Sequence, residues 1–248
     1  MSDADVNGLT QSDDCLLGGR VRYAQPRRGF RSGIEPVLLA AAVPAKPGQR
    51  VLEGGCGAGA ALLCLAVRVA AVRGVGIEQD AALVALARRN AADNERSELT
   101  FIAGDIAASG DAGRFDHAFA NPPYHLASGT ASPDPSRVVA KRGDAAMLAS
   151  WAAALGRALV PRGTLTFILA SAALPVGIAA FAAAGCAASA MLPLWPKEAR
   201  AAKLVLLRGV KGGASPLRVL PGLVLHAPDG RFTPAAEAVL RDGQPLPM

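Results

Sequence analysis

Cysteine and histidine are scarce in this chain of 248 residues. Its four cysteines form no CxxC pair and show no spacing typical of secreted domains, and its three histidines are scattered. We therefore expect neither a disulfide framework nor a metal site, and the cysteine usage indicates a cytoplasmic protein. The first fourteen residues carry four aspartates, no basic residue and no apolar stretch, so we expect a disordered acidic tail rather than a signal peptide.

Charge is absent from one long stretch, which runs from Gly163 to Pro196. A stretch of this length can span a bilayer, but prolines and glycines divide it into short pieces in which alanine dominates. We therefore expect a buried strand, helix and strand here, and no membrane partner.

Aromatic residues make up only 4% of the sequence, whereas 51% is hydrophobic and 19% is charged. This balance argues against a disordered chain, and the length suits one large domain that needs no disulfide or metal to stabilise it. The formal net charge of +6 permits a polyanionic partner without requiring one.

Short apolar segments alternate with helical segments through most of the chain. This alternation predicts an α/β fold in which helices cover both faces of a mostly parallel sheet of seven strands. We expect strands at 50–53, 74–78, 99–103, 115–120, 164–170, 186–194 and 203–207, and helices at 60–72, 80–94, 144–159 and 174–184.

The flanking segments are expected to form smaller units. Residues 16–30 suit a short hairpin or an extended arm, and a helix is expected at 34–43. The turn at Asp229-Gly230 predicts a C-terminal hairpin, followed by a helix at 234–241. The chain then divides into a tail at 1–14, an arm with one helix at 15–49, a main domain at 50–210, and a C-terminal extension packed on that domain at 211–248.

A glycine-rich turn separates the first expected strand of the main domain from its helix. Glu53 is followed by Gly55, Gly57 and Gly59 at alternate positions. Glycines allow positive φ and a close approach of the backbone to a ligand, and the helix that follows offers free N–H groups. The same residues also satisfy the dinucleotide-binding fingerprint, so a nicotinamide oxidoreductase stays open at this point.

Acidic residues end the next two strands. Glu78 lies where a carboxylate can accept hydrogen bonds from ribose hydroxyls, and Asp105 lies where one can meet an exocyclic amine. Together with Glu53 they place three carboxylates at the carboxyl ends of successive strands. Such a site would repel a pyrophosphate, whereas it would accept a cationic sulfonium with an amino acid moiety.

A tetrapeptide, Asn121-Pro122-Pro123-Tyr124, follows the fourth strand. The prolines fix the backbone, and Pro122 has no N–H to donate. The Asn121 side-chain oxygen and the Pro122 carbonyl are therefore two preorganised acceptors, which can hold a planar amino group. Tyr124 offers an aromatic face on which a planar substrate can stack. An oxidoreductase would leave this tetrapeptide without a role.

These motifs resemble those of class I S-adenosylmethionine-dependent methyltransferases that methylate amino groups. The segments 17–22, 33–40 and 220–233 also resemble the bacterial tRNA1(Val) adenine-37 N6-methyltransferase family. The resemblance implies a Rossmann-like fold, S-adenosyl-L-methionine as the cofactor, and Asn121, Pro122, Pro123 and Tyr124 as catalytic residues. The cofactor contacts that it implies are Glu53, Gly55, Cys56, Gly57, Gly59, Glu78, Asp105, Ile106 and Asn121.

The acceptor that the resemblance favours is adenine N6 in tRNA. The same tetrapeptide serves glutamine N5 methylation of release factors, and related forms serve guanine N2 methylation of ribosomal RNA, so these remain alternatives. An RNA-binding module with a vestigial cofactor site is the alternative that is not an enzyme. We expect a monomer or a weak dimer.

Basic residues flank the acidic cofactor half and suit contacts with RNA phosphates. The first group lies in the N-terminal arm and the second follows the tetrapeptide. The candidates are Arg20, Arg22, Arg27, Arg28 and Arg31 in the arm, and Arg137, Lys141 and Arg142 after the tetrapeptide.

Overall fold

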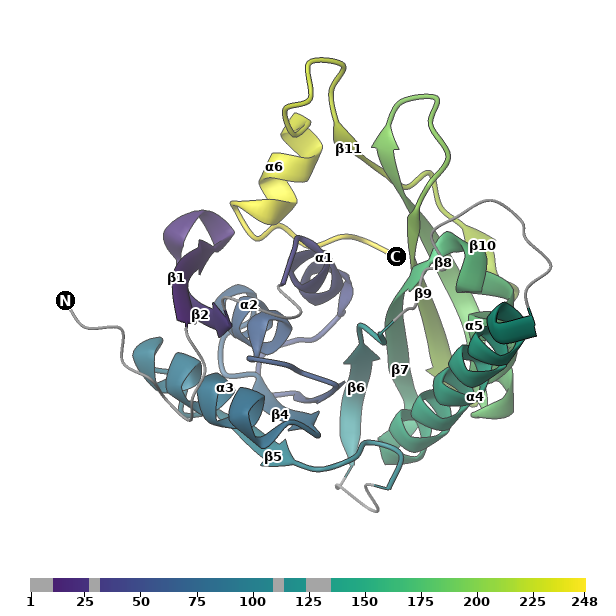
Figure 1. Ribbon diagram of the computed structural model, residues 1–248, viewed down its shortest axis with the longest axis horizontal. Helices are drawn as coiled ribbons and strands as arrows, with labels where there is room; N and C mark the ends of the chain where they lie inside the picture. The colour runs from purple at the N-terminus through teal and green to yellow at the C-terminus, as the bar shows by residue number, and fades with distance from the viewer. Residues whose placement is uncertain (1–10, 27–31, 109–113, 124–134) are drawn as a thin grey trace.

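The computed structural model describes residues 11–26, 32–108, 114–123 and 135–248, with side chains in the last range described from residue 145 (Figure 1). The expected α/β fold is confirmed: a central sheet of mostly parallel strands is covered by helices on both faces. Seven strands follow the order β8-β9-β7-β6-β3-β4-β5, in which β9 alone is antiparallel to its neighbours. Their bounds are β3 (Arg50–Gly54), β4 (Arg73–Glu78), β5 (Leu99–Ala103), β6 (Phe115–Ala120), β7 (Leu159–Ala170), β8 (Cys186–Lys197) and β9 (Leu204–Lys211).

Two further strands, β10 (Arg218–Val219) and β11 (Leu223–His226), extend the sheet to nine, which exceeds the expected seven. Both pair with β8 in parallel, because this strand has twelve residues and its outer edge offers room for two short partners. The expected C-terminal hairpin is present only as a short one, and β11 pairs with β8 as well. The chain turns at Asp229-Gly230, but only a single antiparallel bridge, between His226 and Phe232, closes across the turn.

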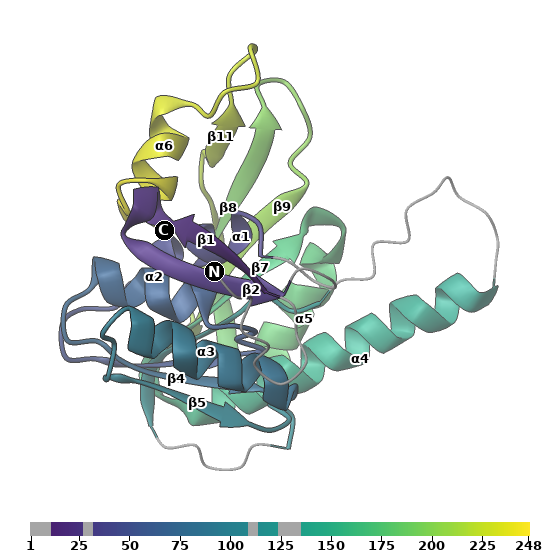
Figure 2. The same ribbon diagram turned by 60° about the vertical axis from the view of Figure 1, so that its left-hand side comes forward.

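Two hydrophobic cores lie on opposite faces of the sheet. One contains the buried residues of three helices before β5, and the other contains those of the two helices on either side of β7. Figure 2 shows the same two layers from the side. The first face carries α1 (Glu35–Ala42), α2 (Ala60–Arg68) and α3 (Ala81–Asp93), and the second carries α4 (Pro135–Ala158) and α5 (Leu174–Ala183).

Helix boundaries differ from the expected ones in two places. Helix α2 ends at Arg68 rather than at residue 72, because Val69 has extended backbone angles and Ala71 has a positive φ. Helix α4 begins nine residues earlier than expected, at Pro135. Helix α3 begins as predicted after Asp80, whose carboxylate accepts hydrogen bonds from the N–H groups of Ala82 and Leu83.

The uncharged stretch forms the end of β7, helix α5 and strand β8, as expected. Gly177 allows α5 to lie close to the sheet, since a Cβ there would stand 2.5 Å from a methyl carbon of Leu169. Within the described ranges, each helix is too short or too polar to cross a membrane.

The N-terminal arm is a separate two-stranded antiparallel hairpin of β1 (Gln11–Leu16) and β2 (Val21–Pro26). Residues 11–14 therefore belong to a strand, whereas the sequence placed them in the tail; residues 1–10 lie outside the described part. The Asp14 carboxylate accepts a hydrogen bond of 2.7 Å from the Gln25 side chain. This acidic residue is thus held by the hairpin.

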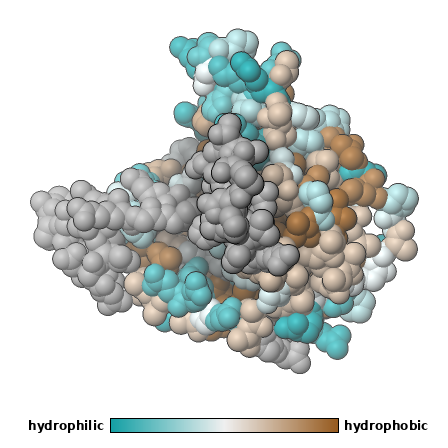
Figure 3. All heavy atoms as spheres, turned by 45° about the vertical axis from the view of Figure 1, so that its right-hand side comes forward, coloured by the Kyte–Doolittle hydropathy of each residue, from teal (hydrophilic) through white to brown (hydrophobic). Residues whose placement is uncertain are grey.

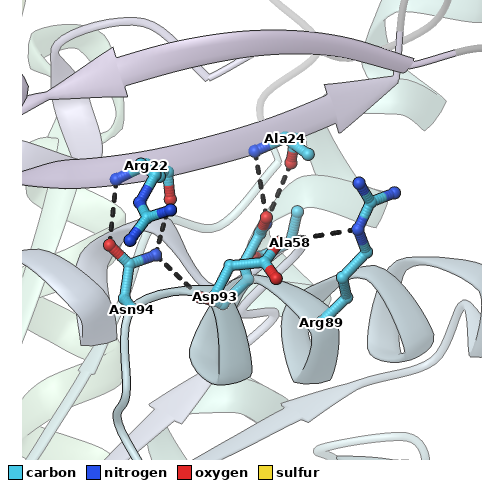
Figure 4. Close-up of polar contacts among 7 residues, drawn as sticks. Arg22, Ala24, Ala58, Arg89, Asp93 and Asn94 are labelled. Atoms are coloured by element: carbon cyan, nitrogen blue, oxygen red, sulfur yellow. Dashed lines mark hydrogen bonds and ion pairs between the residues drawn. The ribbon is translucent and has the colours of Figure 1, made fainter. Parts of the chain in front are cut away.

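Two asparagines, one in α3 and one directly after its last residue, hold the hairpin against the domain. The buried Asn90 carboxamide accepts from the Ala24 N–H and donates to the carbonyls of Ala24 and Ala58. One turn further along, Asn94 bonds the N–H and the carbonyl of Arg22 in the same way (Figure 4). Four helical residues rise about 6 Å, close to the spacing of two strand residues, so each carboxamide meets a backbone position of β2.

The C-terminal segment, which includes helix α6 (Pro234–Leu240), is fixed to α1. The buried Arg208 guanidinium donates to the carbonyls of Ala42 and Met248, and the Leu246 N–H donates to the Ala41 carbonyl. Burial lowers the pKa of Arg208 to about 10. The carbonyls at the end of α1 thus have cationic donors, which suits the helix dipole.

Replacing Asn90 with alanine should lower the free energy of unfolding by about 3 kcal/mol, because buried backbone groups of Ala24 and Ala58 lose their partners. The same substitution at the half-buried Asn94 is the matched control and should cost about 1 kcal/mol. Urea denaturation followed by circular dichroism measures both. Equal losses would show that Asn90 has no special part in holding the hairpin.

Candidate functional site

The glycine turn after β3 has a backbone that few other residues can adopt. Gly55 and Gly59 have φ values of 63° and 88°, and Gly59 precedes the first residue of α2. A Cβ on Gly55 would also stand 2.5 Å from the Trp151 ring of α4. The turn is tied to the sheet, since the N–H groups of Gly55 and Cys56 both point to the Ile77 carbonyl. Its backbone is therefore exposed to a ligand at a fixed position.

Glu78 ends β4 with its carboxylate held by two backbone donors. One oxygen accepts from the Gly57 N–H and the other from the Asp80 N–H, each at 3.0 Å. The carboxylate thus joins the glycine turn to the start of α3. The next strand supplies Asp105, which is exposed and accepts from the Ala107 N–H at 2.8 Å.

A cleft of about 640 Å³ opens at the carboxyl ends of the parallel strands. This volume and position are typical of small-molecule sites in open α/β sheets. Many residues expected at the site line it together. They are Gly55, Gly57, Glu78, Asp105, Ile106, Asn121, Pro122 and Pro123.

The cleft also has walls that sequence reasoning did not predict. Met147 and Trp151 come from α4, and Leu204 opens β9. Trp151 is one of only two tryptophans in the chain, and this rarity is the one feature of the sequence that could have indicated a place in the site. The remaining unpredicted lining residues are Gly33, Glu35, Ile77, Gln79, Leu83 and Gly104.

A second cavity, of about 60 Å³, lies between the hairpin strand β2 and the glycine turn. Tyr23 lines it from the hairpin, with its hydroxyl 2.9 Å from the Ser32 hydroxyl. Burial raises the pKa of Tyr23 to about 12, so this hydroxyl stays protonated. Asn121 lines both cavities and therefore lies where they meet.

Glu53 lines the small cavity and is 4% exposed. Burial raises the pKa of its carboxyl well above the usual value, a backbone hydrogen bond from Leu62 opposes this, and the charge of Glu78 adds to the rise. One Glu53 oxygen has no hydrogen-bond partner within the described ranges. A buried carboxylate with an unpartnered oxygen is stabilised either by binding a proton or by a cation close to it.

Cys56 packs inside the turn as a small thiol. A Cβ on Gly76 would stand 2.7 Å from its sulfur, so the side chain fills the space against β4. Burial raises the pKa of this thiol well above the usual value. Cys56 therefore fills space against β4 and also lines the small cavity, whereas Gly59 lines neither cavity.

The tetrapeptide after β6 is described for its first three residues. Asn121 is half-buried, Pro122 is buried and Pro123 is exposed. Tyr124 lies outside the described residues, as do Arg27, Arg28 and Arg31 and the side chains of Arg137, Lys141 and Arg142.

Two arginines proposed for RNA contact are described. The Arg20 guanidinium donates to the carbonyls of Leu17 and Arg241, so this side chain joins the hairpin to the C-terminal segment. Arg22 is exposed beside α3. Neither residue lines the two cavities.

Comparisons with known proteins agree with this fold. Residues 35–144 match the family model described as methyltransferase small domain. The chain is 31% identical over 144 residues to the tRNA1(Val) (adenine(37)-N6)-methyltransferase of Aeromonas hydrophila, covering 58% of this chain and 61% of that protein. The chain therefore matches about three fifths of the length of this curated relative.

Two solved structures share the fold. A predicted O-methyltransferase from Agrobacterium tumefaciens has 21% identity and a TM-score of 0.70, with 86% of this chain and 98% of that chain covered. A methyltransferase from Pyrococcus furiosus has 18% identity and a TM-score of 0.56, with 78% and 90% covered. These two structures confirm the class I methyltransferase fold expected from the sequence, and the curated relative confirms the resemblance.

Replacing Glu53 with glutamine should stabilise the ligand-free protein at pH 8. The folded state raises the carboxyl pKa, so stability falls as pH rises above the value of the unfolded chain, and the neutral amide removes this loss. We expect the melting temperature to rise by about 2–4 °C at pH 8 and to change much less at about pH 3.5, below the usual glutamate pKa, where Glu53 is neutral in both the folded and the unfolded chain. If the variant melts at a lower temperature than the wild type at pH 8, the buried Glu53 carboxylate does not destabilise the folded protein.

Proposed function

We propose that this chain, which matches the methyltransferase small domain model at residues 35–144, transfers a methyl group from S-adenosylmethionine to an exocyclic amino nitrogen of RNA. The observation that carries the proposal is the position of the tetrapeptide. Asn121, Pro122 and Pro123 line the same cleft as Glu78, Asp105 and the glycine turn. A cofactor and an amino acceptor held by these two sets of residues would lie side by side.

The residues of the cleft suit S-adenosylmethionine. The Glu78 carboxylate suits the ribose hydroxyls, Asp105 suits the adenine amino group, and Ile106 offers an apolar surface. The unpartnered oxygen of Glu53 lies beside the glycine turn, where a cationic group would offset its burial. When bound, this cofactor supplies an electrophilic methyl group on a sulfonium.

The protein contributes mainly position. The Asn121 side-chain oxygen and the Pro122 carbonyl accept hydrogen bonds from the amino group of the substrate and stabilise the positive charge that develops on its nitrogen. Holding both reactants in line contributes roughly 7–11 kcal/mol. The proton leaves the nitrogen after transfer, so the mechanism requires no strong base. Tyr124 would stack on a base that has left its helix.

The acceptor we propose is adenine N6 in tRNA, and the support is the identity with the Aeromonas hydrophila relative. A cytoplasmic enzyme that is a monomer or a weak dimer fits this function. Guanine N2 in ribosomal RNA is a second acceptor with the same chemistry. Nucleoside analysis after methyl transfer to total tRNA, ribosomal RNA and a release factor separates these acceptors, and no transfer to any of them would leave only a binding module.

Two substitutions should separate acceptor binding from cofactor binding. Asn121→Ala should slow methyl transfer by about a hundredfold or more, while affinity for S-adenosylmethionine stays nearly unchanged. Glu78→Ala should weaken that affinity at least about tenfold, because a charged hydrogen-bond acceptor is lost. Calorimetry measures the affinity and single-turnover assays measure the transfer.

Glu78→Gln is the control, since it removes the charge but keeps an acceptor for the Gly57 N–H. Full activity of the Asn121 variant would overturn the assignment of the tetrapeptide. Unchanged cofactor affinity in the Glu78→Ala variant would place the ribose elsewhere.

A further inference from the structure

Strands β8 and β9 continue past the edge of the sheet that carries the cleft. Leu204 pairs with Ala170, the last residue of β7, on one side and with Leu194 of β8 on the other. Residues 195–203 therefore extend beyond the carboxyl ends of the parallel strands. Figure 1 shows this turn and the loop after β11 rising together at the top of the molecule. We call residues 195–203 with β11 and the loop 227–233 the projection.

A groove of about 460 Å³ lies in the projection, and Trp195, Lys197 and Arg200 line it. The indole N–H donates to the Pro221 carbonyl at 3.1 Å, and a Cβ on Gly222 would stand 2.6 Å from the same nitrogen. One edge of the ring is thereby fixed. The groove thus has an aromatic wall whose position is set before a ligand arrives.

The projection is also basic. Its four basic residues outnumber its two acidic residues, Glu198 and Asp229; the basic ones are Lys197, Arg200, Lys203 and Arg231. Arg200 and Lys203 are exposed, and the projection forms the hydrophilic top of the molecule in Figure 3. The cofactor side of the cleft instead carries Glu78 and Asp105. A polyanion would therefore be attracted to the projection and repelled by the two carboxylates on the cofactor side of the cleft.

The groove lies close enough to serve the same substrate as the cleft. Strand β9 neighbours β7, which neighbours β6, and Asn121 directly follows β6. Two strand spacings put the start of β9 roughly 10 Å to the side of the tetrapeptide, and the register puts it about 10 Å further along the strand direction, since Ala120 pairs with Phe167 and Leu204 with Ala170. Leu204, the first residue of β9, itself lines the cleft.

We propose that this groove binds a single-stranded segment of the RNA substrate next to the methylated nucleotide. Phosphates contact Arg200 and Lys203, and a base stacks on Trp195. Cationic side chains beside an aromatic face are the usual elements of single-strand binding. This inference rests on the proposed RNA methylation and adds the surface that holds the acceptor.

The first test reverses charge at two exposed positions. The double variant R200E/K203E should bind bulk bacterial tRNA at least about tenfold more weakly than wild type at physiological salt, and the slope of log affinity against log salt should fall by about one or more. The double variant K46E/R73E is the matched control. It makes the same charge change at exposed residues on the opposite edge of the sheet, where β3 and β4 begin.

The second test isolates the aromatic face. W195F and W195L both lose the indole hydrogen bond, but only W195F keeps a ring. A fluorescent single-stranded RNA of twelve nucleotides should bind W195L about tenfold more weakly than W195F. Affinity for S-adenosylmethionine should be the same in both variants, which confirms that each one folds.

The outcomes distinguish this inference from the proposed function. If the wild-type protein methylates RNA but R200E/K203E binds tRNA as well as K46E/R73E does, the groove is not the RNA surface. Equal affinities of W195F and W195L would likewise overturn the stacking contact. If the wild-type protein methylates a release factor and no RNA, the proposed function fails, and the inference about the groove fails with it.

Discussion

Three hydrogen bonds from the buried Asn90 carboxamide hold the hairpin, helix α3 and the glycine turn in one arrangement. The bonds to Ala24 fix the strand that carries Tyr23, and the bond to Ala58 fixes the turn that carries Gly57. The small cavity lies between these two segments, so its walls depend on this one side chain. Glu78 continues the connection, because it bonds Gly57 and the start of α3.

The sheet and the main motifs were predictable because each depends on a short stretch of sequence. Apolar strands next to glycines and acids define where β3, β4 and β5 end, and those ends meet at one edge of any parallel sheet. Asn90 was not predictable, because it stands in a polar run of α3 that suits a solvated helix face. It is buried only because β2 covers that face.

Contacts between distant segments account for the other differences. Trp151 reaches the cleft because α4 crosses the sheet beside Gly55, and nothing near Trp151 in the sequence indicates that contact. The pairing of β11 with β8 was missed for a related reason. The turn at Asp229-Gly230 indicates a hairpin locally, but the free edge of the long strand β8 offers more backbone partners than the short return segment.

The length of β8 has a consequence for how this chain can diversify. Beyond Leu194 the strand no longer pairs within the seven-stranded sheet, so insertions or deletions in the β8–β9 turn leave the register of β7 and β6 intact. The loop bearing Asn121 would keep its place through such changes. The surface formed by the β8–β9 turn can therefore change between related proteins while the residues that line the cleft keep their positions.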